Sequence, residues 1–238
     1  MKILVSIFLL CVLGFTGFAF AQENKREQVH KTIADLRSAL NKAEEEFLSP
    51  AAEDLAKYAE FLKQPNTGLI RILPREIYDK PSELTIRGGG SYYSFSRLTH
   101  EYGYGSDIEL QQNNFSVGFA GADYGFITKV DDIPLQEITT ENPLASVMAS
   151  YEPATVLSKA RIEQHKVSQG FEINGVRFRD RVDAVAGNTY LLRSVNYETS
   201  DVLVCFQVVR KDNDGSMILT WKLLKKFDTP KLERDSEK

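Results

Sequence analysis

The pattern of hydrophobic residues changes from helical to β-like near residue 67. Within residues 25–63, the first apolar positions are spaced alternately by four and three, which is the heptad pattern of an amphipathic helix. Ser49 and Pro50 then indicate a second helix start, because serine caps free N–H groups and proline fits the first turn. We therefore predict a helical hairpin over residues 22–66. Its heptad positions are Val29, Ile33, Leu36, Leu40, Ala43 and Phe47.

Residues 67–228 carry mainly the pattern of short β-strands. Apolar or alternating runs are separated by Gly, Pro, Asn and Asp, which is typical of an antiparallel sheet. Asn174-Gly175 is the turn preferred by a tight β-hairpin. The run 201–210 is apolar on both faces, which predicts a central strand. The other expected strands are 69–73, 84–86, 92–97, 115–119, 126–130, 171–173, 176–178, 189–195 and 217–224.

Residues 141–169 interrupt the β pattern with a helical one. Asn142 followed by Pro143 is again a helix-start signal, and Gly170 follows the segment. The whole pattern predicts an α+β fold. It consists of the helical hairpin and one domain with a mainly antiparallel sheet, or a partly open barrel, that contains this helical insertion. A disordered polar tail is expected over residues 229–238.

The first 21 residues have the pattern of a cleaved signal peptide. Lys2 precedes an apolar run, and Ala19-Phe20-Ala21 is a small-x-small cleavage site before an abruptly polar stretch. We therefore expect an exported protein, periplasmic or secreted, with no integral membrane segment after cleavage. One alternative is an uncleaved membrane anchor, since the run is close to spanning length. A lipid anchor at Cys11 is disfavoured, because Leu10 occupies a position where a small residue is expected.

Charge and cysteine content narrow the functional classes. The net charge is −4 with acidic and basic residues interspersed, so the sequence lacks the basic patch of a nucleic-acid-binding protein. Loss of Cys11 with the signal peptide would leave Cys205 alone, which excludes an internal disulfide. Cys205 lies in an apolar run and is expected to be a buried small hydrophobe.

The glycine-rich stretch 87–110 does not match a phosphate-binding loop. Gly88-Gly89-Gly90 is followed by Ser-Tyr-Tyr instead of Lys-Ser/Thr, and the third glycine of a dinucleotide fingerprint is missing. These glycines are expected to bend a sheet.

Metal-binding motifs are also missing from the sequence. Asp212–Gly215 lacks the final glutamate of a calcium loop, and the three histidines are far apart in sequence. The sequence therefore predicts no metal and no cofactor.

Tyrosines in the same stretch suggest a ligand-binding surface. Tyrosine combines a large apolar ring with a polar tip, and arginine adds a charged hydrogen-bond donor. If residues 92–97 form one strand, Tyr93 and Arg97 share one face and Tyr92 lies on the other. The alternative is that these rings fill the core. The predicted ligand-binding residues are Tyr92, Tyr93, Arg97, Tyr102 and Tyr104.

Three functions follow from these observations. The first is a non-enzymatic binding or interaction module of the cell envelope or periplasm, whose partner is an unknown small ligand or another protein. The second is a small hydrolase in which His100 acts with Glu101 and Asp107. The third is an oligomeric scaffold that self-associates through residues 25–63, although this arm could equally pack on its own sheet.

Overall fold

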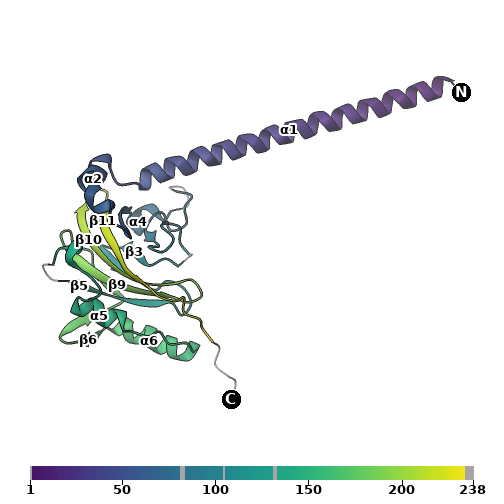
Figure 1. Ribbon diagram of the computed structural model, residues 1–238. Helices are drawn as coiled ribbons and strands as arrows, with labels where there is room; N and C mark the ends of the chain where they lie inside the picture. The colour runs from purple at the N-terminus through teal and green to yellow at the C-terminus, as the bar shows by residue number, and fades with distance from the viewer. Residues whose placement is uncertain (1, 81–83, 104, 131–132, 234–238) are drawn as a thin grey trace, which may run out of the picture. The chain divides into compact units, whose positions relative to one another are not determined.

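The computed structural model describes residues 2–80, 84–103, 105–130 and 133–233, and the chain divides into two units. The first unit, residues 1–47, is helical, and helix α1 runs from Lys2 to Leu48 (Figure 1). The second unit, residues 48–238, contains all the other helices and strands. Among the residues described here, no helix is both long and apolar enough to cross a membrane.

The helix start predicted at Ser49 and Pro50 is wrong by two residues. Helix α2 (Ala52–Lys57) begins after Ala51, whose backbone is extended and whose side chain forms no cap. Its first turn is instead held by Asp54, which forms an ion pair with Arg210 of a distant strand. A separate helix α3 (Ala59–Leu62) follows at Tyr58, so the segment is not one continuous helix.

The largest sheet contains five antiparallel strands in the order β1-β11-β10-β9-β5. Strand β10 lies at its centre, as the two-sided apolar pattern of residues 201–210 predicts. Most of its side chains are buried. The bounds are β1 (Thr67–Ile72), β11 (Met217–Lys226), β10 (Ser200–Lys211), β9 (Thr189–Asn196) and β5 (Tyr124–Val130).

A smaller antiparallel sheet has the order β2-β3-β4-β8, and strands β6 and β7 form a separate hairpin. This hairpin turns at Asn174 and Gly175, both with positive φ, which confirms the turn predicted from their sequence. The bounds are β2 (Tyr92–Tyr93), β3 (Ile108–Gln111), β4 (Asn114–Ser116), β8 (Arg181–Asp183), β6 (Phe171–Ile173) and β7 (Val176–Phe178).

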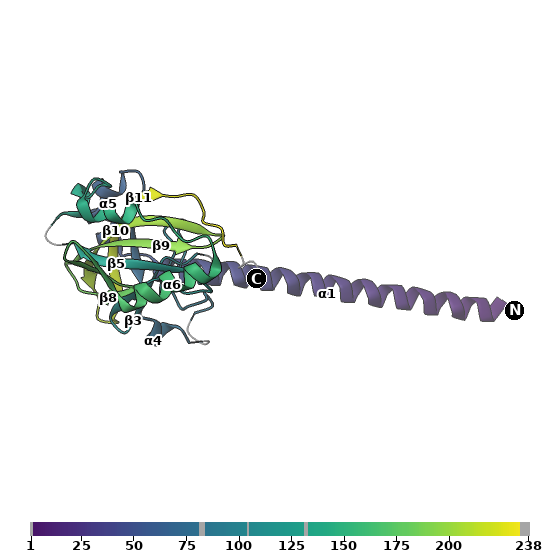
Figure 2. The same ribbon diagram turned by 90° about the horizontal axis from the view of Figure 1, so that it is seen from below.

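Helices cover one face of the five-stranded sheet. Helices α5 (Pro143–Ala149) and α6 (Leu157–Gln169) lie on one side of it, while β3 and the short helix α4 (Arg75–Tyr78) lie on the other (Figure 1). Figure 2 shows α6 crossing this face beside β5. The start of α5 is as predicted, since the Asn142 side chain accepts hydrogen bonds from the N–H groups of Leu144 and Ala145. A 3₁₀ turn, η1 (Leu135–Glu137), precedes α5.

Alternating side chains of β10 belong to two separate cores. Val204 and Phe206 pack with residues of the smaller sheet, and Leu203 and Cys205 pack with residues of α5 and α6. Cys205 is fully buried, as expected, and burial raises the pKa of its thiol. The second unit is therefore α+β, with a small sheet, a large sheet and helices as successive layers.

Two strand predictions in the glycine-rich part are corrected by the structure. Residues 84–86 form no strand, and Thr85 and Ile86 lie in bends. The strand expected over residues 92–97 ends at Tyr93, because the backbone N–H of Leu98 donates to Ser94 O and closes a turn. Tyr92 and Tyr93 are both buried, so the strand has no exposed face.

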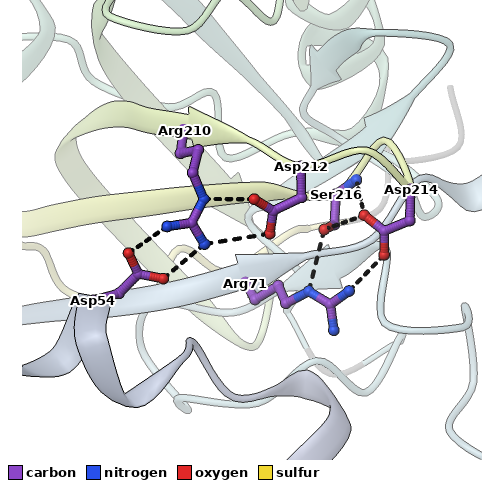
Figure 3. A network of polar contacts seen from close by, with 6 residues as sticks. All are labelled: Asp54, Arg71, Arg210, Asp212, Asp214 and Ser216. Carbon is purple, nitrogen blue, oxygen red and sulfur yellow. Dashed lines mark hydrogen bonds and ion pairs between the residues drawn. The ribbon is translucent and has the colours of Figure 1, made fainter.

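Ion pairs hold the β10–β11 turn against the start of the second unit. Arg210 donates to both carboxylate oxygens of Asp54 and also pairs with Asp212, and Arg71 pairs with Asp214 (Figure 3). Asp214 in turn accepts a hydrogen bond from Ser216. Residues 212–215 are thus a hairpin turn fixed by side chains.

The tail expected to be disordered from residue 229 is hydrogen-bonded through Glu233 to Thr155 and Leu157. Residues 234–238 are outside the described part.

Candidate functional site

The tyrosines predicted to bind a ligand do not gather on the surface. Tyr92 and Tyr93 are 4% and 6% exposed, and burial raises the pKa of both hydroxyls. The half-buried Tyr102 ring lies 4.6 Å from the Tyr92 ring. Arg97 is exposed on the turn that follows β2, and Tyr104 lies outside the described residues. The two buried rings fit the alternative prediction, in which tyrosines fill the core.

His100, Glu101 and Asp107 are each bound to different groups. His100 Nε2 lies 2.8 Å from the carbonyl oxygen of Arg71, so this nitrogen carries the proton and donates. Burial lowers the pKa of His100 to about 4, despite this bond. Glu101 forms an ion pair with Arg87. In the described part of the chain, no hydrogen bond joins two of the three residues, and each has a partner outside the set.

Asp107 belongs instead to a buried polar cluster. Its carboxylate accepts hydrogen bonds from the backbone N–H of Phe95 at 2.7 Å and from Asn196 Nδ2 at 2.9 Å. Asn196 also donates to Ser194 and Ser200. Burial raises the pKa of Asp107 to about 7, and the donors around it only partly oppose this shift. The cluster links the turn after β2 and the residue before β3 to β9 and β10 through polar contacts inside the fold.

A hollow of about 630 Å³ lies where the edge of the large sheet meets the small sheet. We call it the basic groove. Its volume is within the usual range of ligand-binding clefts. Its cationic side chains are Lys129, Arg177, Arg179 and Arg181, and Asp183 is the only carboxylate among the described residues that line it. The other lining residues are Asn114, Thr128, Gly175, Val176, Val182, Val185, Asn188 and Tyr190.

One segment, from β7 to β8, supplies the three arginines. The segment leaves the β6–β7 hairpin and makes a two-way backbone bridge between Arg179 and Ile127 of β5. It then enters the small sheet, where Arg181 is opposite Ser116 of β4. Alternate residues of an extended segment project to the same side. Arg177, Arg179 and Arg181 therefore line the groove, while Phe178 between them is fully buried in the core.

None of the three arginines forms an ion pair with a described carboxylate, although the charges of Arg179 and Arg181 oppose the rise in the pKa of nearby Asp180. Arg177 makes a long contact, 3.4 Å, to the carbonyl oxygen of Gln169. The ion pairs found in the described part of the molecule involve none of Arg177, Arg179 and Arg181, and all three side chains are exposed. Adjacent guanidinium groups repel one another, and an anion bound between them would relieve this repulsion.

Backbone and side-chain bonds fix the floor of the groove. Tyr190 is buried, and its hydroxyl donates to the carbonyl oxygen of Asp183 at 2.7 Å. The same hydroxyl accepts from the backbone N–H of Val185. Thr128 Oγ1 donates to the carbonyl oxygen of Arg177. These contacts hold the segment that carries the arginines on a rigid pair of strands, which favours a preformed site.

A second hollow, of about 330 Å³, lies beside α6 on the other side of this segment. It is lined by Asp123, Asp180 and His165, among other residues. Burial raises the pKa of Asp123 to about 6 and also raises the pKa of Asp180. Asp123 accepts from the backbone N–H of Tyr197, a structural bond. No hydrogen bond between described residues connects His165 to either carboxylate, so this hollow lacks an assembled acid–base pair.

The basic groove was not predicted, although the sequence carries a signal for it. Arg-Phe-Arg-Asp-Arg over residues 177–181 places cations at alternate positions of a β pattern. Lys129 is about 50 residues away from this run in the sequence. The strand pairing that brings Lys129 to the same groove is a tertiary feature. The described lining contains no His, Cys or Ser, and its hydroxyl groups, those of Thr128 and Tyr190, donate to backbone carbonyl oxygens.

Comparison of the chain with protein-family models, with curated proteins and with solved structures gives no match.

Proposed function

We propose that this chain is an exported, non-enzymatic binding protein that holds an anionic ligand in the basic groove. The observation that carries the proposal is the set of exposed arginines, 177, 179 and 181, which line the groove and form no ion pair with a described carboxylate. Guanidinium groups bind carboxylate and phosphate through paired hydrogen bonds. Export is supported by the signal-like pattern of the first 21 residues.

The chemistry of the groove favours binding over catalysis. Catalysis of hydrolysis requires a nucleophile or an activated water together with a general base. Asp183 is the only carboxylate in the described lining, and it is exposed. The residues of the hydrolase hypothesis, His100, Glu101 and Asp107, each have other partners. The groove is thus better suited to hold a charged molecule than to transform it.

Calorimetric titration with inorganic tripolyphosphate, a generic polyanion, tests the proposal. The variant Arg179→Gln/Arg181→Gln should bind the probe at least about tenfold more weakly than the unchanged protein. The variant Lys159→Gln/Arg161→Gln is the matched control, because it removes two exposed charges from α6 that do not line the groove. Equal loss in both variants, or no binding by the unchanged protein, would contradict the proposal.

Self-association through α1 is a second proposal, supported by the heptad pattern. Val29 and Leu36 of this pattern are 51% and 65% exposed. Such a stripe is buried when two helices form a coiled coil. Light scattering on the full chain should give a mass above one subunit, and Leu36→Glu/Leu40→Glu should lower it. Lys31→Glu, outside the stripe, is the control, and a single-subunit mass for the unchanged chain would refute this proposal.

A further inference from the structure

The cations of the basic groove form a row. Arg177, Arg179 and Arg181 occupy alternate positions, and alternate residues of extended backbone are about 6.5–7 Å apart. The segment bends at Asp180, yet all three arginines line the groove. The Cα atoms of the row therefore span at most about 13 Å, the length of the same segment without the bend. A compact anion can contact one or two of these groups, whereas a chain with repeated charges can contact all of them.

The remaining polar groups of the groove are suited to hydroxyls. Asn114 and Asn188 donate through their amide nitrogens to Gln112 O and to the Tyr190 hydroxyl. Their side-chain carbonyl oxygens can accept further hydrogen bonds. Asn114 lies opposite Asp183 in the β4–β8 pairing, so an amide and a carboxylate are neighbours on the two strands. A carboxylate accepts hydrogen bonds from hydroxyl groups, but it repels a polymer whose negative charges are closely spaced.

The groove offers no surface for stacking nucleic acid bases. Tyr190 is the only aromatic residue among the described lining residues, and its side chain is 1% exposed. Its ring packs against Phe115 and Phe206 inside the core. Single-stranded nucleic acids are usually held by exposed aromatic rings in addition to cations. A basic groove without such rings does not favour this class of ligand.

We infer that the ligand is a linear glycan whose sugar rings carry carboxylate groups; this inference rests on the proposed anion-binding function. The row of guanidinium groups binds the carboxylates, each as a planar pair of hydrogen bonds. The Asn114, Asn188 and Asp183 side chains bind the hydroxyls between them. A glycan spaces its charges with uncharged, hydroxyl-bearing parts, which fits a groove that contains both kinds of group.

The test is calorimetric titration of the full chain with a galacturonate hexamer. Four other probes are compared with it: monomeric galacturonate, the methyl-esterified hexamer, tripolyphosphate and the oligonucleotide dT6. The hexamer should bind at least about 100-fold more tightly than the monomer, because a linked chain engages successive arginines. The esterified hexamer, which has lost its charges, should not bind measurably. Arg179→Gln/Arg181→Gln should weaken hexamer binding at least about tenfold, unlike Lys159→Gln/Arg161→Gln.

Asp183→Asn separates the role of hydroxyl contacts from that of charge. This variant keeps a hydrogen-bonding group but removes the only carboxylate of the described lining. Binding of tripolyphosphate should become tighter, by about threefold or more, while hexamer binding changes less than this. A circular dichroism spectrum identical to that of the unchanged protein would show that each variant is folded.

The outcomes distinguish failure of the two proposals. If tripolyphosphate binds and depends on Arg179 and Arg181, but the hexamer binds no better than the monomer, the glycan inference is wrong and the anion-binding function stands. Tighter binding of dT6 than of the hexamer would likewise reject the glycan in favour of a nucleic acid. If no anionic probe depends on these arginines, both proposals are wrong.

Discussion

Arg193 and Asp201 form an ion pair that is almost completely buried. Arg193 Nε and Nη2 donate to the two carboxylate oxygens of Asp201 at 2.6 and 2.8 Å, and the two side chains are 1% and 2% exposed. A third N–H of Arg193 donates to the carbonyl oxygen of Met148 near the end of α5. The guanidinium also lies 3.2 Å from the centre of the Phe227 ring. The pair therefore connects β9, β10, α5 and the chain after β11.

Removing one member of this pair should be strongly destabilising. Asp201→Ala leaves the guanidinium buried without its carboxylate, and we expect a loss of about 3–5 kcal/mol in the free energy of unfolding. Denaturant unfolding followed by circular dichroism measures this loss. The double variant Arg193→Met/Asp201→Leu should lose less than Asp201→Ala, because no unpaired charge remains. Glu137→Gln is the control, because the Glu137 side chain is exposed at the end of η1. An unfolding free energy for Asp201→Ala equal to that of the control would refute the prediction.

His100 and Asp107 should make opposite contributions to the pH dependence of stability. The pKa of His100 is lowered to about 4 by burial. Its contribution to the free energy of unfolding therefore has its full value above pH 6.5 and is lost as the pH falls towards 4. The pKa of Asp107 is raised to about 7 by burial, so its contribution is complete below pH 3.8 and is lost as the pH rises through 7. Between about pH 4 and 6.5 the two contributions oppose each other.

Single substitutions should reveal each contribution. In His100→Gln, which can still donate to Arg71 O, stability should fall as the pH rises from 4 to 7. In Asp107→Asn, stability should fall as the pH decreases from 6.5 to 4. Each slope is at most about 1.4 kcal/mol per pH unit relative to the unchanged protein. Urea unfolding at half-unit pH intervals measures the slopes, and identical profiles for all three proteins would show that neither group has a shifted pKa.

Arg210 should stabilise the fold through the buried carboxylate of Asp54. Asp54 is 5% exposed and accepts both of its hydrogen bonds from this guanidinium, at 2.6 and 2.8 Å. Arg210→Ala should therefore cost about 1–3 kcal/mol, and Arg210→Lys should recover only part of it, because lysine lacks the planar fork. Thermal unfolding gives the measurement. A double-mutant cycle with Asp54→Ala isolates the pair, and strictly additive effects would show that the two residues are not coupled.

Gly68 should be required for the position of Trp221. The two residues face each other in the β1–β11 pairing, and a Cβ at residue 68 would collide with the indole ring. Gly68→Ala should cost about 1–3 kcal/mol and should shift the fluorescence of Trp221, which is the only tryptophan in the chain. In a Trp221→Leu background, the same substitution should cost less. An unchanged emission spectrum and melting temperature in Gly68→Ala would contradict this prediction.

Local patterns in the sequence correctly predicted several elements. The two-sided apolar run of β10, the Asn174-Gly175 turn and the Asn142 cap each depend on neighbouring residues alone, and all three are confirmed. Helix α2 begins later than its serine–proline signal predicts, and its first turn carries Asp54, which pairs with Arg210, 156 residues away. Long-range electrostatic contacts of this kind leave no periodic pattern in the sequence.

The candidate site was harder to predict, because it depends on contacts between distant parts of the chain. Alternation along residues 92–97 predicted one core face and one solvent face, with Tyr92 and Tyr93 on opposite faces, but both faces of β2 are buried. The arginines of the basic groove are visible as an alternating run. Whether nearby carboxylates pair with them depends on strand positions that the sequence alone does not give. Asp180, between two of these arginines, lines the other hollow.

The pairing of β1 with β11 has a consequence for the order of folding. Contacts such as that between Arg71 and Ser216 join residues 145 positions apart, so β1 has to wait for the last strand of the sheet. Closing so long a loop carries an entropic cost, and folds dominated by distant contacts form slowly. During synthesis from the N-terminus, the edge of the large sheet cannot form until almost the whole chain has left the ribosome. The large sheet of the nascent protein should therefore remain incomplete until a late stage of synthesis.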